Sequence, residues 1–327
     1  MVARAFVAAV VALGLAAVAP AGAAAAENRW IVEDRTWNIA HQGGEDEFPS
    51  NTMYAFKRSL QAGADMLELD VGVTGDGQVV VMHDTTVDRI TNGTGTVASK
   101  TLAQMRRLDG AYWFAGGSDA YSHTRPRSAY RFRGVATGDR RPPRGFRAKD
   151  FRVPTLREVL RAFPRTPINI EIKGRTKDEK LEEYLANAEV LASLLKPSTR
   201  RDIIVVSFPQ EAVDRFHELA PRIPVAPGVG GSADYLLGGK RPGPGTVAFQ
   251  LPITYMFGGS KVDVTTKDNV ARAHRDGLAW HTWLSVDPDT PASWRKLIDW
   301  CVDGVMAARP VAFERLLEQR KRPAACP

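Results

Sequence analysis

The chain has 327 residues and a formal net charge of +7 at neutral pH. Apolar residues make up 44% of it and charged residues 25%, which is typical of a globular protein and excludes a disordered one. Residues 110–152 hold ten basic and three acidic side chains, an excess equal to that of the whole chain. The rest of the chain is neutral, so we expect no nucleic-acid partner.

The first 26 residues are predicted to be a secretory signal peptide. Arg4 precedes an apolar run over residues 6–19, which is shorter than the ~18 or more residues of a membrane span. Small residues at alternating positions allow cleavage near Ala23 or Ala26. We therefore expect a protein that is secreted or held in the periplasm or cell envelope, without stable membrane insertion.

Two cysteines are present, Cys301 and Cys326. An oxidising compartment permits a disulfide between them. Cys301 lies in an apolar run, however, and a buried free thiol fits equally well. Two cysteines are too few for a cysteine-based metal site.

Residues 27–327 are predicted to form one α/β domain. Apolar runs typical of strands covered on both faces alternate with helical stretches. The predicted strands are residues 37–40, 66–71, 79–82, 168–172 and 203–206, with weaker candidates at 224–226, 247–251, 278–283 and 304–307. Eight or nine such strands favour a closed TIM (β/α)8 barrel.

Apolar residues at helical spacing predict helices between these strands. Met53, Phe56 and Leu60 form the first apolar stripe, with Ser50 or Asn51 as the helix cap. Further stripes begin at Leu156, Leu181, Val213 and Trp294.

Two segments predict an irregular barrel. The connection between residues 71 and 79 is too short for a crossover helix, which needs about a dozen residues, and it contains turn residues. Residues 110–152 lack periodicity and form a basic insertion after the third strand. Long insertions on such barrels often lie over the active site, so we expect this segment to form a lid or rim that attracts an anionic substrate.

Titratable residues gather at the ends of four successive predicted strands. They are His41, Glu68, Asp70, His83, Asp84, Glu171 and Lys173. The carboxyl ends of barrel strands meet at one mouth, so these side chains should lie together. Each one alone could be a structural ion-pair or hydrogen-bonding residue, but so many buried charges together predict a functional site. Three neighbouring carboxylates call for a hard divalent cation such as Ca²⁺ or Mg²⁺.

Several short motifs occur in a characteristic order and spacing. They are HQGG (41–44), PSNT (49–52), ELDV (68–71), TGDG (74–77), HD (83–84), DFRVPTL (150–156) and EIK (171–173). Together they resemble the glycerophosphodiester phosphodiesterase family. The resemblance implies a Ca²⁺- or Mg²⁺-dependent TIM barrel that hydrolyses glycerophosphodiesters, its small-molecule substrates, to an alcohol and glycerol 3-phosphate.

The resemblance also implies a role for each matching residue. The general acid/base pair would be His41 and His83. The metal ligands would be Glu68, Asp70 and Glu171. The substrate-binding residues would be Lys173, Gln42 and Trp283.

Three positions depart from the family pattern. The usual Arg after the first His is Gln42, the usual Glu between Pro and Asn is Ser50, and the usual Thr-Asp before Arg309 is Ala-Ala. These changes spare the histidines and the carboxylates, so they bear on substrate preference more than on activity. An arginine of the basic insertion could replace the missing cation.

Two other functions fit the sequence. One is a sphingomyelinase-D- or phospholipase-D-like enzyme that acts on intact lipid. The other is a non-catalytic protein whose basic segment binds an anionic polymer of the cell envelope. The intact set of histidines and carboxylates argues against the second.

Overall fold

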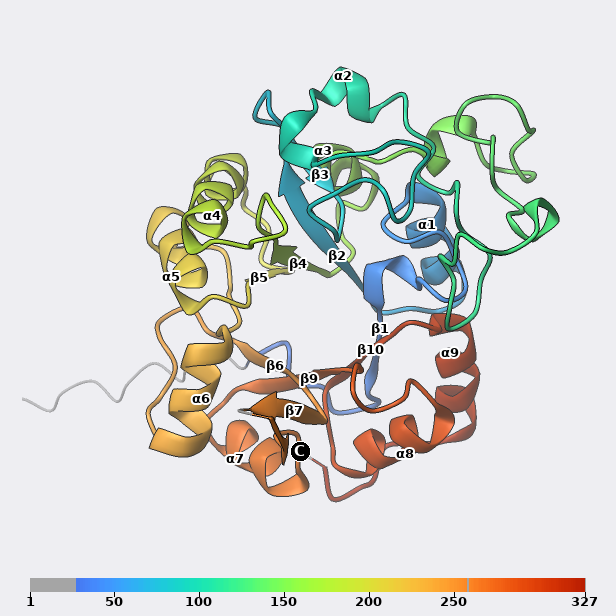
Figure 1. The fold of residues 1–327 in the computed structure, drawn as a ribbon. Helices are drawn as coiled ribbons and strands as arrows, with labels where there is room; N and C mark the ends of the chain where they lie inside the picture. The colour runs from blue at the N-terminus through green and yellow to red at the C-terminus, as the bar shows by residue number, and fades with distance from the viewer. Residues whose placement is uncertain (1–27, 258, 327) are drawn as a thin grey trace, which may run out of the picture.

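A computed structural model describes residues 28–257 and 259–326 (Figure 1). The predicted signal peptide, residues 1–26, lies outside the described residues. A curled parallel sheet occupies the centre, and helices surround it (Figure 1). Its hydrogen-bonded order is β5-β4-β2-β1-β10-β9-β6. These strands are β1 (Trp37–Ala40), β2 (Met66–Val73), β4 (Ile168–Ile172), β5 (Ile203–Val206), β6 (Ala248–Pro252), β9 (Ala279–Trp283) and β10 (Gly304–Ala307).

A single-residue rung joins the two ends of this sheet. Val225 forms parallel bridges to Val205 of β5 and to Thr246, just before β6. Its N–H donates to the Gly245 carbonyl at 3.0 Å, and its carbonyl accepts from Val247 N–H at 3.0 Å. The weak strand predicted at 224–226 is reduced to this rung because a proline on each side offers no N–H to a ladder. The irregular barrel is thereby confirmed.

The short connection after β2 is a hairpin, as its length predicts. β3 (Val79–Val81) pairs antiparallel with β2, with Val71 opposite Val81. Thr74 holds the turn: its hydroxyl donates to Asp76 at 2.6 Å and accepts from Gln78 N–H at 2.9 Å. The third strand of the sequence therefore lies outside the barrel wall, which passes directly from β2 to β4.

Nine α-helices are found in the described part of the chain. They are α1 (Met53–Gln61), α2 (Leu102–Met105), α3 (Leu156–Ala162), α4 (Leu181–Leu195), α5 (Gln210–Leu219), α6 (Val229–Gly238), α7 (Lys267–Arg275), α8 (Pro291–Asp299) and α9 (Pro310–Gln319). Sequence reasoning missed α2, α6, α7 and α9, as well as a hairpin of β7 (Thr254–Phe257) and β8 (Ser260–Asp263). None of the described helices is long and apolar enough to cross a bilayer.

The cap of α1 is Thr52, and the prediction of Ser50 or Asn51 is wrong. The Thr52 hydroxyl accepts from Ala55 N–H at 3.1 Å, which satisfies a free donor of the first turn. Asn51 has a left-handed backbone, with φ of 57°. Ser50 and Asn51 are therefore available for contacts in the site.

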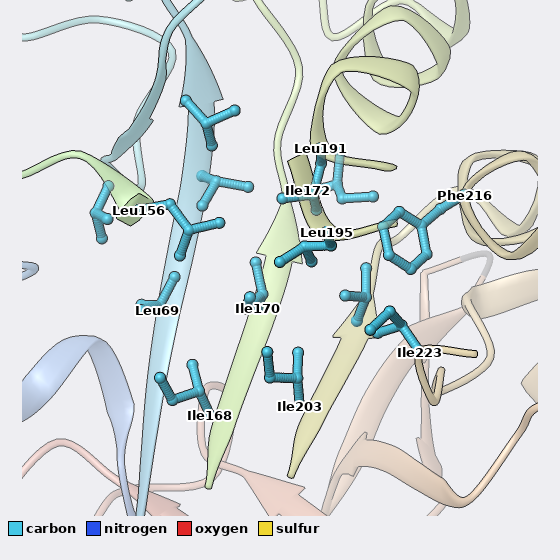
Figure 2. Close-up of a cluster of buried hydrophobic side chains, with 14 of the residues drawn as sticks. Leu69, Leu156, Ile168, Ile170, Ile172, Leu191, Leu195, Ile203, Phe216 and Ile223 are labelled. Atoms are coloured by element: carbon cyan, nitrogen blue, oxygen red, sulfur yellow. The ribbon is translucent and has the colours of Figure 1, made fainter. Parts of the chain in front are cut away.

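The outer faces of β2, β4 and β5 pack against α3, α4 and α5 in one apolar cluster (Figure 2). On β4, Ile168, Ile170 and Ile172 all belong to this cluster and are fully buried. Successive strand residues point to opposite faces, so Asn169 and Glu171 point into the barrel. Burial of each isoleucine stabilises the fold by roughly 1.5–3 kcal/mol. Because side chains alternate along the strand, burying the isoleucines outside also points the polar residues inward.

Trp30 closes the barrel at the amino ends of the strands. It is 1% exposed and packs with inward-facing residues such as Ile39, Met66 and Ile204. The open mouth is therefore at the carboxyl ends of the strands, where sequence reasoning placed the site.

Cys301 and Cys326 form a disulfide, with their Cα atoms 5.4 Å apart. It joins the tail that follows α9 to the connection between α8 and β10. This finding decides between the two states that the sequence left open.

The basic insertion, residues 110–152, packs beside α1 (green, upper right in Figure 1). Phe132 and Phe151 lie against Tyr54 of α1, with ring centroids 5.0 and 4.5 Å apart. None of its residues lines the cavity at the barrel mouth. The segment therefore does not line this cavity as a lid, because its aromatic residues pack against α1, and its Tyr121 hydroxyl contacts the backbone N–H of Ser50 beside the site.

Candidate active site

The carboxyl ends of the strands surround a cavity of about 430 Å³. Six of the eight predicted site residues line it: His41, Glu68, His83, Glu171, Lys173 and Trp283. Asp70 is fully buried beside them in a group of carboxylates. Gln42 is 5% exposed and is not among the lining residues. The fold therefore brings together residues that lie more than 200 positions apart in the sequence.

Glu68, Asp70 and Glu171 form a carboxylate cluster. One oxygen of each lies within 4.8 Å of the others, and Asp70 stands opposite Glu171 in the register of β2 and β4. Burial, together with the charge of Asp70, raises the pKa of Glu68 to about 8. A donor set of carboxylate oxygens fits a hard divalent cation, which would relieve this repulsion.

Lys173 supplies a positive charge at the edge of the cluster. Its Nζ lies 2.7 Å from Glu171 Oε1 and 3.2 Å from Asp70 Oδ1. Burial alone would lower the pKa of Lys173, but Glu171 and Asp70 raise it above its usual range. Lys173 therefore remains a cation that faces the cavity.

Two donors hold the carboxylates in place. The backbone N–H of Gln42 donates to Glu68 Oε2 at 2.7 Å, and Asn51 Nδ2 donates to Asp70 Oδ2 at 3.0 Å. Gln42 and Asn51 both have positive φ values, 48° and 57°. Such backbone strain often occurs at functional sites, and here it accompanies the contacts to two predicted metal ligands.

His41 lies in a short turn, η1 (His41–Gly43), directly after β1. Gly43 and Gly44 have φ values of 78° and 92°, and a Cβ on Gly44 would come within 2.7 Å of Pro310. His41 Nδ1 contacts the Glu45 carboxylate, and Nε2 lies 4.0 Å from Glu68 Oε2. Burial would lower the pKa of His41, but Glu45 and Glu68 raise it to about 10.

His83 follows β3 and has its own carboxylate partner. Its Nδ1 lies 2.7 Å from Asp84 Oδ1, and Arg89 donates two hydrogen bonds to Asp84 at 2.6 and 3.0 Å. Burial opposes ionisation of Asp84, but the hydrogen bonds from His83 and Arg89 hold its pKa well below the usual range. An ionised Asp84 fixes a proton on Nδ1 and leaves Nε2 free to act on a substrate.

Trp283, the aromatic residue expected near the substrate, lies on the cavity wall. Its Nε1 donates to the Gln250 carbonyl at 3.2 Å, and its ring lies 5.9 Å from that of Phe208. Below it, Gln250 Nε2 donates to Asn169 Oδ1 at 2.7 Å. Asn169 and Gln250 also line the cavity and give its floor a neutral polar surface.

Sequence reasoning missed the contacts that orient the catalytic candidates. Glu45 lies four residues after His41, and Asn51 lies within the PSNT motif, but neither was assigned a role in the site. Asp84 was named among the titratable residues at the strand ends, but it was not assigned to His83. The sequence did carry one signal for Glu45 and Asp84, since each is an acidic residue close to a predicted catalytic histidine and could be its hydrogen-bond partner.

Two departures from the family pattern lie side by side. The Ser50 hydroxyl donates to Gln42 Oε1 at 2.6 Å, and both side chains are buried. Both of these side chains are neutral in this chain, and they satisfy each other by this hydrogen bond. Among the described residues that line the cavity Lys173 is the only lysine or arginine, and no arginine of the basic insertion is among them.

Comparison with known proteins identifies the family of this site. A model of the glycerophosphoryl diester phosphodiesterase family matches residues 41–312, from the first histidine to α9. The chain belongs to this family. A glycerophosphodiester phosphodiesterase of Bacillus subtilis is 30% identical over 301 residues, 90% of either chain. Like its relatives, the chain is a glycerophosphodiester phosphodiesterase, and the prediction of an enzyme is confirmed.

Solved structures of the family share the fold. The glycerophosphoryl diester phosphodiesterase domain of a Mycobacterium tuberculosis protein has a TM-score of 0.62 at 19% identity, covering 86% of this chain and 99% of that one. An Oleispira antarctica phosphodiesterase, solved with its product sn-glycerol-3-phosphate, has a TM-score of 0.59 at 19% identity and covers 86% and 96%. The phosphodiesterase barrel predicted from the sequence is confirmed.

Proposed function

We propose that this phosphodiesterase hydrolyses deacylated phospholipids to an alcohol and glycerol 3-phosphate with a divalent cation and two histidines. The observation that carries the proposal is that His41 and His83, from different connections, line the same cavity as Glu68 and Glu171. The product bound to the Oleispira antarctica phosphodiesterase supports the choice of substrate class.

Glu68, Asp70 and Glu171 would hold Ca²⁺, with Mg²⁺ as the alternative. When bound, the cation would neutralise charge that develops on the non-bridging phosphate oxygens. Lys173 Nζ, at the edge of the cluster, donates to the same phosphate and orients it. Neutralising the charge of Glu68 would also lower the pKa of His41, as a general base requires.

The two histidines would divide the proton transfers. His41 removes the proton of the glycerol 2-hydroxyl, which attacks phosphorus, and His83 protonates the departing alcohol. A water then opens the cyclic phosphate with the roles reversed and yields glycerol 3-phosphate. Glu45 and Asp84 hold the Nδ1 atoms, so each Nε2 is the atom that exchanges a proton.

The test is release of glycerol 3-phosphate from glycerophosphocholine in the presence of Ca²⁺, with EDTA as control. His41→Ala and His83→Ala should each lower kcat by about 10²- to 10⁴-fold. Both variants should still bind Ca²⁺ in calorimetry, whereas Glu68→Gln should bind it more weakly. His217→Ala, a histidine of α5 outside the cavity lining, is the matched control. Near-normal turnover in either catalytic variant, or full activity in EDTA, would contradict the proposal.

We also propose that the protein is exported. The charge and apolar pattern of residues 1–26 supports this, as does the disulfide, which an oxidising compartment permits. N-terminal sequencing of protein from the medium or envelope should find a chain that begins at Ala24 or Glu27. Full-length protein confined to the cytoplasm would contradict export.

A further inference from the structure

The active-site cavity has a wall that the proposed chemistry does not use. This apolar wall is formed by α6, the β7–β8 hairpin and the loop after β5, and α6 and β7 lie across the ring of strands from β2 (Figure 1). We define it by Phe208, Val229, Leu236, Leu237, Phe257 and Val262. A glycerol phosphodiester with a polar headgroup has no group that gains by contact with these side chains.

The apolar wall is unusual for its exposure. Eight large apolar side chains are exposed in the described part of the chain, and five of them line this one cavity. Leu237 is 82% exposed and Phe257 is 66% exposed. Exposed apolar side chains that are scattered singly need no explanation, but a group of them at one cavity indicates a binding surface.

The wall is continuous with the catalytic end of the cavity. One space is lined by His41, His83 and Lys173 at one end and by the apolar wall at the other. Its volume of about 430 Å³ lies within the range of pockets that enclose small molecules. A molecule that spans it has a phosphodiester at one end and an apolar group at the other.

Resting on the proposed function, we propose that the substrates include lysophospholipids, whose single acyl chain on the glycerol lies along the apolar wall. Such a lipid keeps a free 2-hydroxyl, the nucleophile assigned above. The bond between phosphorus and the headgroup oxygen breaks, the headgroup leaves as its alcohol, and water supplies the atoms of the second step. The products are the alcohol and a 1-acylglycerol 3-phosphate.

The charges around the cavity favour a single lipid molecule over a lipid surface. Proteins that dock on anionic membranes surround the contact with lysine and arginine. In the described part of the chain Lys173 is the only lysine or arginine that lines the cavity, and it is held by the carboxylate cluster. The basic insertion contributes no lining residue.

The first experiment compares kcat/KM for glycerophosphocholine with that for 1-hexanoyl-, 1-octanoyl- and 1-decanoyl-lysophosphatidylcholine, each below its critical micelle concentration. Because burial of each methylene group is favourable, kcat/KM should rise about two- to fourfold for each methylene added to the acyl chain, until the acyl chain covers the apolar wall. If the enzyme hydrolyses glycerophosphocholine but kcat/KM does not rise with the length of the acyl chain, this inference is overturned and the proposed function stands. Failure to hydrolyse any of the four would overturn both.

A second experiment tests whether the acyl chain contacts the apolar wall. The double variant Leu237→Asn/Phe257→Asn should lower the ratio of kcat/KM for the decanoyl substrate to that for glycerophosphocholine by about tenfold, because it removes apolar contacts from the chain. Leu181→Asn on α4, a leucine that is 40% exposed and lies outside the cavity lining, should leave the ratio unchanged.

Two results would assign the wall to another occupant and overturn the inference. Activation that appears only above the critical micelle concentration, or only on phosphatidylglycerol vesicles, would make the wall a docking site for a lipid surface. A dimer in sedimentation that the double variant abolishes, with no dependence on chain length, would make it an interface between two copies of the chain.

Discussion

At the residue scale, the two histidines differ in how they are held. His41 Nδ1 contacts the Glu45 carboxylate. No other side chain among the described residues forms a hydrogen bond with Glu45. Asp84, the partner of His83, is itself held by Arg89. A carboxylate fixed on both sides orients an imidazole more strictly, so the His83 side of the site is the more rigidly organised.

Asp84→Asn tests this orientation. The variant loses the anionic acceptor that keeps the proton on His83 Nδ1, so kcat should fall by about 10- to 100-fold with little change in KM. Steady-state kinetics with glycerophosphocholine measures both constants. Asp88→Asn, at an exposed carboxylate nearby, is the control, and an Asp84→Asn enzyme within about twofold of the parent would show that Asp84 does not position His83.

His281 is a buried histidine with no assigned part in the reaction. It lies on β9 inside the barrel and is fully buried, and neither ring nitrogen has a hydrogen-bond partner among the residues that the structure describes. Burial lowers its pKa to about 4. Between this value and the ordinary histidine value of about 6.5, the unfolded chain binds a proton that the folded chain does not. His281 therefore reduces the stability of the fold progressively as the pH falls through this window.

His281→Leu should remove this pH dependence. The free energy of unfolding of the parent should be lower at pH 4.5 than at pH 7, and His281 should account for about 2–3 kcal/mol of that difference. The variant should lack this contribution. Urea unfolding at the two pH values, followed by circular dichroism, measures the difference. Equal losses in the two proteins would show that His281 does not titrate in this range.

At the scale of elements, one short loop serves several purposes. In the PSNT motif Ser50 pairs with Gln42, Asn51 holds Asp70, and Thr52 caps α1. The start of a helix is thereby coupled to the position of a predicted metal ligand. The apolar residues at helical spacing placed α1 correctly, but the predicted cap was wrong because the side chains of Ser50 and Asn51 contact Gln42 and Asp70 instead.

The disulfide is the clearest test at this scale. Cys301 and Cys326 are 25 residues apart, and closing a loop of this length in the unfolded chain is worth about 3 kcal/mol in the entropy model. The double variant Cys301→Ser/Cys326→Ser should therefore have a free energy of unfolding lower by about 2–4 kcal/mol. Its kcat should be unchanged because neither cysteine lines the cavity. A parent protein whose Tm is insensitive to reductant would contradict the pairing.

At the scale of the whole molecule, the net charge of +7 lies on one flank. Residues 110–152 pack beside α1 and contribute no residue to the cavity lining. At physiological salt the Debye length is about 8 Å, so exposed charges act mainly on their immediate surroundings. The segment is therefore a poor candidate for attracting the substrate into the cavity.

Arg140→Gln/Arg141→Gln/Arg144→Gln tests this conclusion. Because these side chains lie outside the cavity lining, kcat/KM for glycerophosphocholine should stay within about twofold of the parent at physiological salt, with the same salt dependence. Stopped assays over a series of ionic strengths measure both. A clear rise in KM together with a flatter salt response would show that the insertion does attract the substrate.

Much of the site could be predicted from the sequence because it depends on strand geometry. Glu68 and Asp70 point the same way since they are two residues apart on β2, and the turn residues after β2 require a hairpin. The acidic residue four positions after His41 was visible in the sequence, but the geometry of its contact with His41 depends on the strained turn at Gln42, which the sequence did not indicate. Helix α6, rich in glycine, showed no clear helical pattern.

By itself the sequence determined the alternation of buried and inward-facing residues, the succession of strands and helices along the chain and the set of titratable residues at the strand ends. These properties follow from local spacing, which every strand and turn obeys. Tertiary structure alone decided that Val225 joins the sheet ends, that Cys301 pairs with Cys326, that the basic insertion packs on α1 and that an apolar wall faces the histidines. Each of these features depends on contacts between segments that are far apart in the sequence. Local sequence patterns do not predict the free energies of such contacts.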